Sequence, residues 1–347
     1  MTDSFSGPLF VVGMWRSGTS LLYTLLNQHP QIALMYEADL PLLRPLFSRQ
    51  GSKVDWLARW EFWNSALSRH QIQIGRIPVV VPDLASGATA VWKEYAGSAV
   101  MGEKSPDYFD CLPTLAREFP GSRFIVIWRD VADVCRSMVH ARAGASFFSK
   151  PGLLHRAVIG SHKMKLGCSA LLQRKIPLHQ VQYEEMIQDP VRVMAGICNF
   201  LELPFDPRMA SLQGADHSSI YQGSHHDQVK GEKILGAREK KEVLSLRWKR
   251  KIQRYTSYWQ EQYAGTWPRY PKLQAATSDH PSSAERFCDE MLYRGLRTVD
   301  RFTAWVYCYA PLRVLQKYRD FKNQRYRSPE APHQPALAPE SPVETLR

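Results

Sequence analysis

The first residues that could do chemistry lie in a short loop between Gly13 and Gly18. A continuous apolar stretch precedes the loop and leucines at helical spacing follow it, so the sequence predicts a buried strand, a tight turn and a helix start. Such a turn directs backbone N–H groups and a helix N-terminus at one point, which suits a phosphate or sulfate. The spacing matches G-x-x-x-x-G-K-[ST], but Thr19 replaces the lysine and Arg16 supplies a cation inside the loop. We therefore expect an anion held by a guanidinium rather than triphosphate hydrolysis.

The loop Arg16–Ser20 resembles the 5′-phosphosulfate loop of sulfotransferases that use 3′-phosphoadenosine 5′-phosphosulfate (PAPS). A second segment agrees with this resemblance. A predicted strand over 123–128 ends in Arg129, and Ser137 follows eight residues later on a predicted helix. The family holds the 3′-phosphate of PAPS with an Arg and a Ser at this spacing. The resemblance therefore implies that Arg129 and Ser137 bind that phosphate.

Three further segments match the family in order. Residues 101–106 resemble its Lys-Thr/Ser-Pro stretch, which implies that Lys104 lies near the transferring sulfuryl group. Residues 181–190 resemble its Tyr-Glu-Asp-Leu segment, and residues 224–230 resemble a late loop that closes over the nucleotide. The matches span roughly residues 8 to 250 and are nearest to the tyrosylprotein and bacterial sulfotransferases.

The resemblance implies transfer of a sulfuryl group from PAPS to a hydroxyl acceptor by in-line displacement, with 3′-phosphoadenosine 5′-phosphate (PAP) as product. It places Arg16 and Lys104 as catalytic cations. The remaining residues that it implies for cofactor binding are Ser17, Gly18, Thr19, Ser20, Arg129, Ser137, Tyr183, Ser224 and Lys230. This chemistry needs no metal, and the sequence shows no acidic metal-binding cluster.

Glu37 is the candidate general base. It lies 21 residues after Arg16, the spacing at which the tyrosylprotein enzymes carry their catalytic Glu, and it ends a predicted strand over 32–37. A partly desolvated carboxylate can take a hydroxyl proton near neutral pH. Those enzymes carry an Arg two residues further on, where this chain has Asp39, so an acidic peptide acceptor is not expected from the resemblance alone.

Other functions remain as alternatives. Thr19 in the lysine position, with no Asp placed to bind Mg²⁺, argues against a P-loop kinase or NTPase, and a non-catalytic nucleotide-binding module is a further alternative. The net charge of +12 favours anionic partners, but no nucleic-acid motif accompanies it and we expect no nucleic-acid partner. The cytosolic sulfotransferases use a His as base, which leaves His29 and His140 as weaker candidates. The acceptor could be a carbohydrate, a lipid, a small alcohol or phenol, or a peptide tyrosine.

Strands alternate with helices, so the sequence predicts an α/β fold: a P-loop-like parallel sheet flanked by helices, with ligands at the carboxyl ends of the strands. Residues 75–92 are punctuated by Pro and Gly and are predicted to be loop. The predicted divisions are an α/β domain over 1–270, a linker over 271–284, a helical region over 285–327 broken near Pro311, and a disordered tail over 328–347.

The helical region over 285–327 mixes aromatic with basic residues and has two interpretations. It could contact a membrane surface or partner, or it could pack its aromatics on the core or on a second subunit. We favour the second, because such stripes are usually core. No secretory signal or membrane span is evident, so we expect a cytoplasmic bacterial enzyme. The sequence leaves the oligomeric state open.

Overall fold

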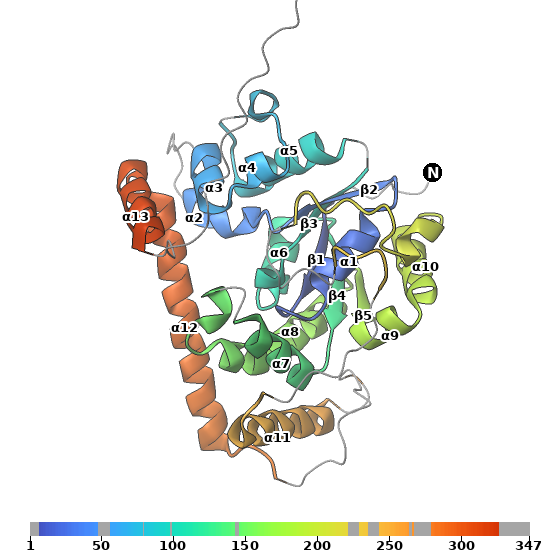
Figure 1. Cartoon of the computed structure of the whole chain (residues 1–347), viewed down its shortest axis with the longest axis vertical. Coiled ribbons are helices and arrows are strands. Elements are labelled where there is room, and N and C mark those ends of the chain that lie inside the picture. Colours follow the sequence, from blue (N-terminus) through green and yellow to red (C-terminus); the bar gives the residue numbers. More distant parts are fainter. Residues whose placement is uncertain are drawn as a thin grey trace, which may run out of the picture. The chain divides into compact units, whose positions relative to one another are not determined.

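The computed structural model describes residues 7–47, 56–78, 80–97, 99–142, 146–220, 229–234, 243–263, 266 and 279–325. Its centre is a parallel sheet with the strand order β2-β3-β1-β4-β5 (Figure 1). The strands are β1 (Leu9–Gly13), β2 (Ile32–Tyr36), β3 (Val100–Lys104), β4 (Arg123–Trp128) and β5 (Leu178–Gln182). The predicted parallel α/β sheet is confirmed.

Helices cover both faces of the sheet. They are α1 (Thr19–Leu26), α2 (Arg44–Phe47), α3 (Trp56–Asn64), α4 (Ala66–Arg69), α5 (Leu84–Ala96), α6 (Leu112–Glu118), α7 (Val131–Ala141), α8 (Leu153–Gln173), α9 (Tyr183–Gln188), α10 (Pro190–Leu201), α11 (Leu246–Gln262), α12 (Ser283–Tyr309) and α13 (Leu312–Arg325). Val11 and Ile127 pack with the side chains of α1 and α10 on one face. The alternate residue Phe10 packs against Trp92 of α5 on the other, as expected for strands that are buried on both sides.

The helix α5 corrects the prediction that residues 75–92 form a loop. Asp83 caps α5 by accepting a hydrogen bond from the Ser86 N–H at 2.8 Å. Gly87 lies inside the helix, where a Cβ would meet Val81 at 3.1 Å. Close packing therefore explains why a glycine stands inside this helix, although glycine has a low helix propensity and favoured the loop prediction.

The strand register brings the predicted site residues to one edge of the sheet. Lys104 at the end of β3 pairs with Val11 of β1 and with Tyr36 of β2. Gly13 at the end of β1 pairs with Ile127 of β4. The residues that directly follow these strand ends therefore gather where parallel α/β sheets bind ligands.

The contact map divides the chain into two compact units, residues 1–308 and 309–347. Helix α12 belongs to the first unit up to Cys308. Ion pairs explain this, since Asp289 lies 2.6 Å from Lys251 of α11 and Asp300 lies 2.6 Å from Arg156 of α8. The predicted linker at 271–284 lies mostly outside the described residues and stays a prediction. The second unit holds α13, and the predicted break near Pro311 is confirmed. Residues 271–278 and 326–347 lie outside the described residues.

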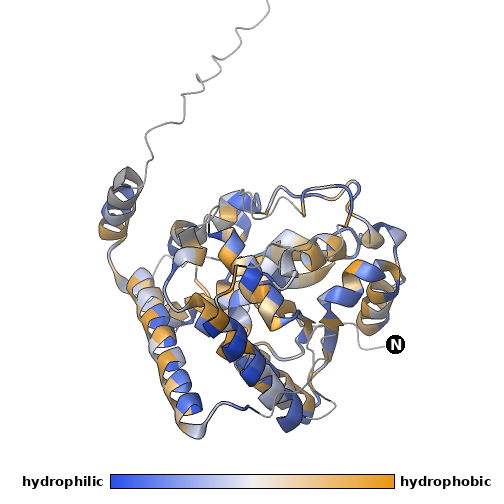
Figure 2. Ribbon diagram, turned by 60° about the horizontal axis from the view of Figure 1, so that its bottom comes forward, coloured by the Kyte–Doolittle hydropathy of each residue, from blue (hydrophilic) through white to orange (hydrophobic). Residues whose placement is uncertain are grey.

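The aromatic residues of α12 do not all pack as we expected. Tyr293 is buried and Tyr307 lies against Trp63 of α3, with ring centroids 5.1 Å apart. Phe287, Phe302 and Trp305 are instead exposed, so they do not pack on the core of this chain, and packing on a second subunit stays a prediction. Hydrophobic and hydrophilic residues alternate along the helix (Figure 2).

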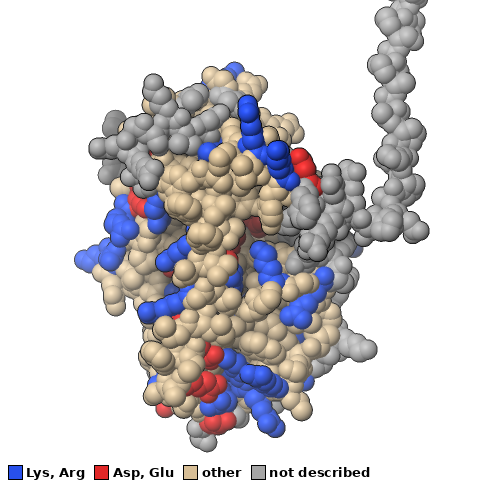
Figure 3. All heavy atoms as spheres, turned by 90° about the vertical axis from the view of Figure 1, so that its left-hand side faces the viewer, with Lys and Arg blue, Asp and Glu red and all other residues tan. Residues whose placement is uncertain are grey.

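The basic character predicted from composition is visible on the surface. Lys and Arg side chains are spread over the face drawn in Figure 3, and fewer Asp and Glu side chains lie between them. No helix in the described part of the chain is both long and apolar enough to cross a membrane.

We predict that Gly102→Ala destabilises the fold by about 3 kcal/mol, because a Cβ at this position would lie 2.1 Å from the Leu9 carbonyl oxygen of the neighbouring strand. Its φ of +146° adds strain for any side chain. Gly295→Ala in α12 is the matched control, since nothing lies within 4 Å of its Cβ and alanine favours a helix. Urea unfolding measures both, and an equal effect of the two substitutions would contradict the prediction.

Candidate active site

The loop after β1 has the form of an anion cradle. A Cβ on Gly13 would lie 2.6 Å from the Ser17 hydroxyl oxygen, so only glycine lets the loop close this tightly. Gly18 has φ +101°, and Tyr183 would lie 2.4 Å from its Cβ. Ser17 Oγ is buried and has no hydrogen-bond partner among the described residues. The first turn of α1 begins at Thr19, so its amide groups also point into the loop.

Arg16, Ser137 and Arg129 meet beside this loop. Arg16 Nε donates to Ser137 Oγ at 3.2 Å, and Arg129 Nη1 donates to the Arg16 carbonyl oxygen at 2.9 Å. Arg129 also lies over the Tyr183 ring, 4.2 Å from its centroid. Its Nε is buried without a hydrogen-bond partner in the described part of the chain. The structure thus joins two groups of residues that the sequence placed 113 positions apart.

Burial and repulsion act together on Arg16. Burial, and then the nearby charge of Arg129, lowers the pKa of Arg16 to about 10. The guanidinium remains charged at neutral pH, but burial keeps water from solvating its charge. Such a site gains stability when an anion binds.

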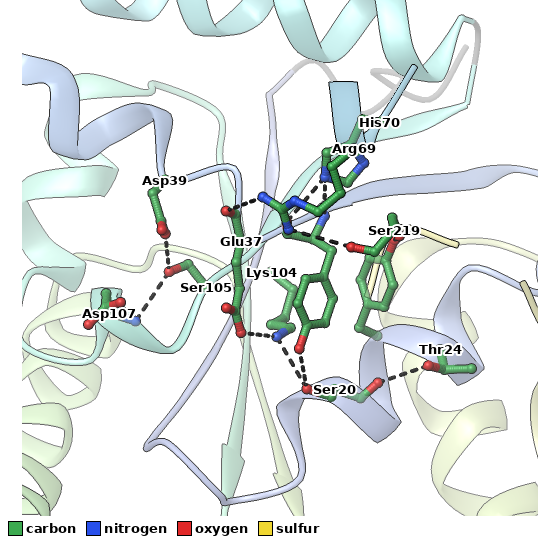
Figure 4. A network of polar contacts seen from close by, with 12 residues as sticks. Ser20, Thr24, Glu37, Asp39, Arg69, His70, Lys104, Ser105, Asp107 and Ser219 are labelled. Atoms are coloured by element: carbon green, nitrogen blue, oxygen red, sulfur yellow. Dashed lines mark hydrogen bonds and ion pairs between the residues drawn. The ribbon is translucent and has the colours of Figure 1, made fainter. Parts of the chain in front are cut away.

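Lys104 and Glu37 form an ion pair next to the loop (Figure 4). Lys104 Nζ lies 2.6 Å from Glu37 Oε1 and 3.4 Å from Ser20 Oγ. The ammonium also lies 3.5 Å from the centroid of the Tyr36 ring, and the Tyr36 hydroxyl is 2.8 Å from Ser20 Oγ. Burial lowers the pKa of Lys104, while Glu37 acts in the opposite direction. The predicted base and the second predicted cation are therefore direct neighbours.

The end of β2 is fixed by α4, which sequence reasoning did not assign to the site. Arg69 donates to the carbonyl oxygens of Tyr36 at 2.7 Å and of Glu37 at 3.1 Å. His70 Nε2 lies 3.1 Å from the Tyr36 carbonyl oxygen. These contacts hold Glu37 at φ +46°, a left-handed conformation that is strained for glutamate. No local motif marks Arg69 or His70, because they act through backbone groups over 30 residues away.

Glu103 is a second residue that the sequence analysis missed. It is fully buried beside Lys104, where Trp92 Nε1 donates to it at 3.3 Å and the Tyr108 hydroxyl also contacts it. Burial raises the pKa of Glu103 well above its usual range. Glu103 therefore supports the strand that carries Lys104 and points away from the loop. Because successive side chains of a strand point to opposite faces, the sequence could have placed Glu103 on the face of β3 opposite Lys104.

The remaining candidates are placed as follows. His29 has a structural position, since its ring nitrogens contact the Pro204 carbonyl oxygen at 2.9 Å and the Gln31 N–H at 3.1 Å. His140 is exposed in the last turn of α7. Lys230 lies in the described segment 229–234. Burial, and to a lesser extent the charge of Lys230, lowers the pKa of His217. Ser224 lies outside the described residues. Within the residues described, no three His, Cys, Asp or Glu side chains gather to hold a metal ion.

We predict that His70 makes the fold acid-sensitive. Burial, and then Arg69, lowers the pKa of His70 from 6.5 to about 4, so the unfolded chain binds a proton between these pH values that the folded chain does not. Stability should fall by up to about 3 kcal/mol between pH 6.5 and 4 from this group. Urea unfolding at pH 7 and 4.5 measures how much unfolding free energy is lost on acidification. His70→Gln should lose less than the wild type, and the exposed-site control His140→Gln should lose as much as the wild type. A wild-type pH dependence in His70→Gln would refute the assignment.

Known proteins are similar to this chain in sequence or in fold. A putative protein-tyrosine sulfotransferase of Caenorhabditis briggsae is 27% identical over 214 residues, which cover 60% of this chain and 70% of the relative. Protein-tyrosine sulfotransferase 1 of Danio rerio is 24% identical over 207 residues, and the chain spans about half of that relative, 54%. The sulfotransferase domain from the curacin biosynthetic pathway is similar in fold, with a TM-score of 0.50 and 19% identity over 74% of this chain and 99% of that domain.

The sequence pattern of the sulfotransferase family matches residues 8–207, which include β1 to β5 and the loop at Arg16–Ser20. This match covers more than half of the chain and agrees with the cradle, the buried cations and the neighbouring carboxylate described above. The protein therefore belongs to the sulfotransferase family.

Proposed function

We propose that this protein transfers a sulfuryl group from PAPS to a hydroxyl acceptor. The observation that carries the proposal is the pair of adjoining anion sites. One is the loop with the buried Ser17 Oγ, and the other is the buried Arg129 Nε, and the contact between Arg16 and Ser137 joins them. A nucleotide with phosphate groups on both its 5′ and 3′ sides would satisfy both sites at once.

In this proposal the chain's own residues divide the work. The loop amides and Ser17 hold the 5′ side, and Arg129 with Ser137 holds the 3′-phosphate. Arg16 and Lys104 stabilise the negative charge that develops on the leaving phosphate. This electrostatic stabilisation is stronger because both side chains are buried. Tyr183 orients Arg129 through the ring contact at 4.2 Å. PAPS would supply the sulfuryl group.

Glu37 is proposed as the base that removes the acceptor's proton. Its carboxylate is half-buried, and Lys104 holds it beside Ser20 of the loop. A hydroxyl that reaches Glu37 is therefore also near the place where the loop would hold the sulfuryl donor. Arg69 fixes the Glu37 backbone and so acts as a positioning residue.

The surroundings of Glu37 favour an acceptor without strong negative charge. At position 39, where the tyrosylprotein enzymes carry an arginine, this chain has an aspartate. Asp39 Oδ1 accepts a hydrogen bond from Ser105 Oγ at 2.6 Å. Burial, and then Glu37, raises the pKa of Asp39 to about 6, and burial raises the pKa of Asp107 to about 8. A further anion in this region would increase the repulsion. Phenols, alcohols and carbohydrate hydroxyls fit this condition, and the named relatives make peptide tyrosine the first acceptor to compare with them.

We predict that PAP binds far more tightly than 5′-AMP and that Arg129→Ala removes the difference. Loss of a charged hydrogen bond should weaken PAP binding roughly 10- to 100-fold in calorimetric titration. Arg123→Ala, at the other end of β4, is the matched control and should bind PAP like the wild type. Equal affinity for PAP and AMP in the wild type would sink the proposal, and Mg²⁺-dependent binding of ATP instead would favour the kinase alternative.

We predict that Glu37→Gln lowers kcat by roughly 10²- to 10⁴-fold, the usual contribution of a general base. PAP affinity should change little, because Glu37 is proposed to act on the acceptor. Transfer from PAPS to a simple phenol and to a tyrosine peptide measures kcat, and calorimetry measures PAP binding. Glu202→Gln, an exposed carboxylate paired with Arg123, is the control. Full turnover by Glu37→Gln would remove Glu37 as the base.

A further inference from the structure

Helix α12 turns a continuous apolar face to solvent. Of the fourteen large apolar side chains that are exposed in the described part of the chain, six lie on this one helix, and each is more than half exposed. They are Phe287, Met291, Leu292, Val299, Phe302 and Trp305. A contiguous exposed patch of this kind indicates an interaction surface rather than ordinary scattered exposure.

The opposite face of α12 holds the helix to its domain through ion pairs, beside the buried side chains of Tyr293 and Cys308. Every carboxylate of the helix has a basic partner on α8 or α11, at distances of 2.6–2.9 Å. These pairs are Glu285 with Arg254, Asp289 with Lys251, Glu290 with Lys163, and Asp300 with Arg156. A surface helix ordinarily packs its apolar side inward. Helix α12 departs from that pattern, because six large apolar side chains face outward while ion pairs and a few buried side chains hold its inner side against the domain.

The charged side chains that are exposed on α12 are arginines. They include Arg294 and Arg301, and no Asp or Glu of the helix is exposed. Arg294 also pairs with the partly exposed Glu290 at 2.8 Å, so Arg301 is the clearest basic group beside the apolar face. Figure 3 looks onto the side of the molecule where α12 lies in Figure 1, and more Lys and Arg than Asp and Glu side chains are visible on that face. Exposed aromatic side chains next to arginine match a partner surface that has an anionic outer layer and an apolar interior.

We propose that the outward face of α12 binds an anionic membrane surface. In a second copy of this chain, a twofold contact would bring the same face onto itself, and its arginines would meet no exposed carboxylate of the partner helix. A bilayer with anionic headgroups meets both requirements, since it buries the aromatic side chains and places anionic groups beside Arg301. The proposal rests on α12 alone and does not depend on the sulfuryl-transfer chemistry.

The helix is anchored close to the end of β3, which gives this surface a defined orientation. Tyr293 Oη donates to Asp110 at 2.6 Å, and Arg297 pairs with the same carboxylate at 2.7 Å. Asp110 lies six residues after Lys104. Membrane contact through α12 would therefore hold the Lys104 side of the domain at a fixed position relative to the bilayer.

Flotation of the full-length protein with lipid vesicles tests the proposal. We expect binding to vesicles of phosphatidylcholine mixed with phosphatidylserine, little binding to phosphatidylcholine alone, and release by high salt. Phe302→Gln combined with Trp305→Gln should weaken binding roughly tenfold or more. Arg301→Glu should have a similar effect on the anionic vesicles only, also roughly tenfold.

The matched control combines Leu166→Gln with Leu172→Gln, which removes two exposed apolar side chains from α8 and should leave binding unchanged. Circular dichroism and PAP binding establish that each variant is folded. Absence of vesicle binding by the folded wild type would overturn the proposal, as would equal binding by the α12 variant. A concentration-dependent dimer in light scattering that Phe302→Gln with Trp305→Gln abolishes would instead assign the face to self-association.

Discussion

Repulsion between two guanidinium groups is the constraint on which the site depends. Burial, and then the charge of Arg129, lowers the pKa of Arg16. The fold still keeps the two side chains together through the Arg129 bond to the Arg16 carbonyl, the Ser137 hydroxyl and the Tyr183 ring. Concentrated positive charge in a buried position destabilises the isolated chain. In the proposed function, a ligand with two phosphate groups would remove that cost on binding, and ligand binding would then stabilise the fold.

The parallel sheet brings this charge together with the carboxylate. Because the strands end at the same edge, Lys104 of β3 reaches the loop after β1 from one side and Glu37 after β2 reaches Lys104. Gly102 allows β3 to approach β1 closely two residues before Lys104. The strained backbone of Glu37 is held by Arg69, which indicates that the carboxylate position is set by the scaffold.

The sequence was informative where the signal is local. The apolar run and the glycine spacing at Gly13–Gly18 predicted the strand, the loop and the helix, because these depend on neighbouring residues. Arg69 and His70 could not be found this way, since their partners on β2 are distant in the chain and are backbone atoms. The aromatic and basic pattern of α12 predicted a helix but not its orientation. That orientation depends on ion pairs with basic residues of other helices, such as Arg156 and Lys251.

A crystal structure of the protein with PAP bound would test the paired anion sites most directly. We expect the 5′-phosphate to lie against Lys104 and the backbone amides of residues 16–20, and the 3′-phosphate to lie within hydrogen-bond distance of Arg129 and Ser137. A nucleotide bound elsewhere, or one bound in the loop with its 3′-phosphate in solvent, would contradict the assignment of the paired anion sites.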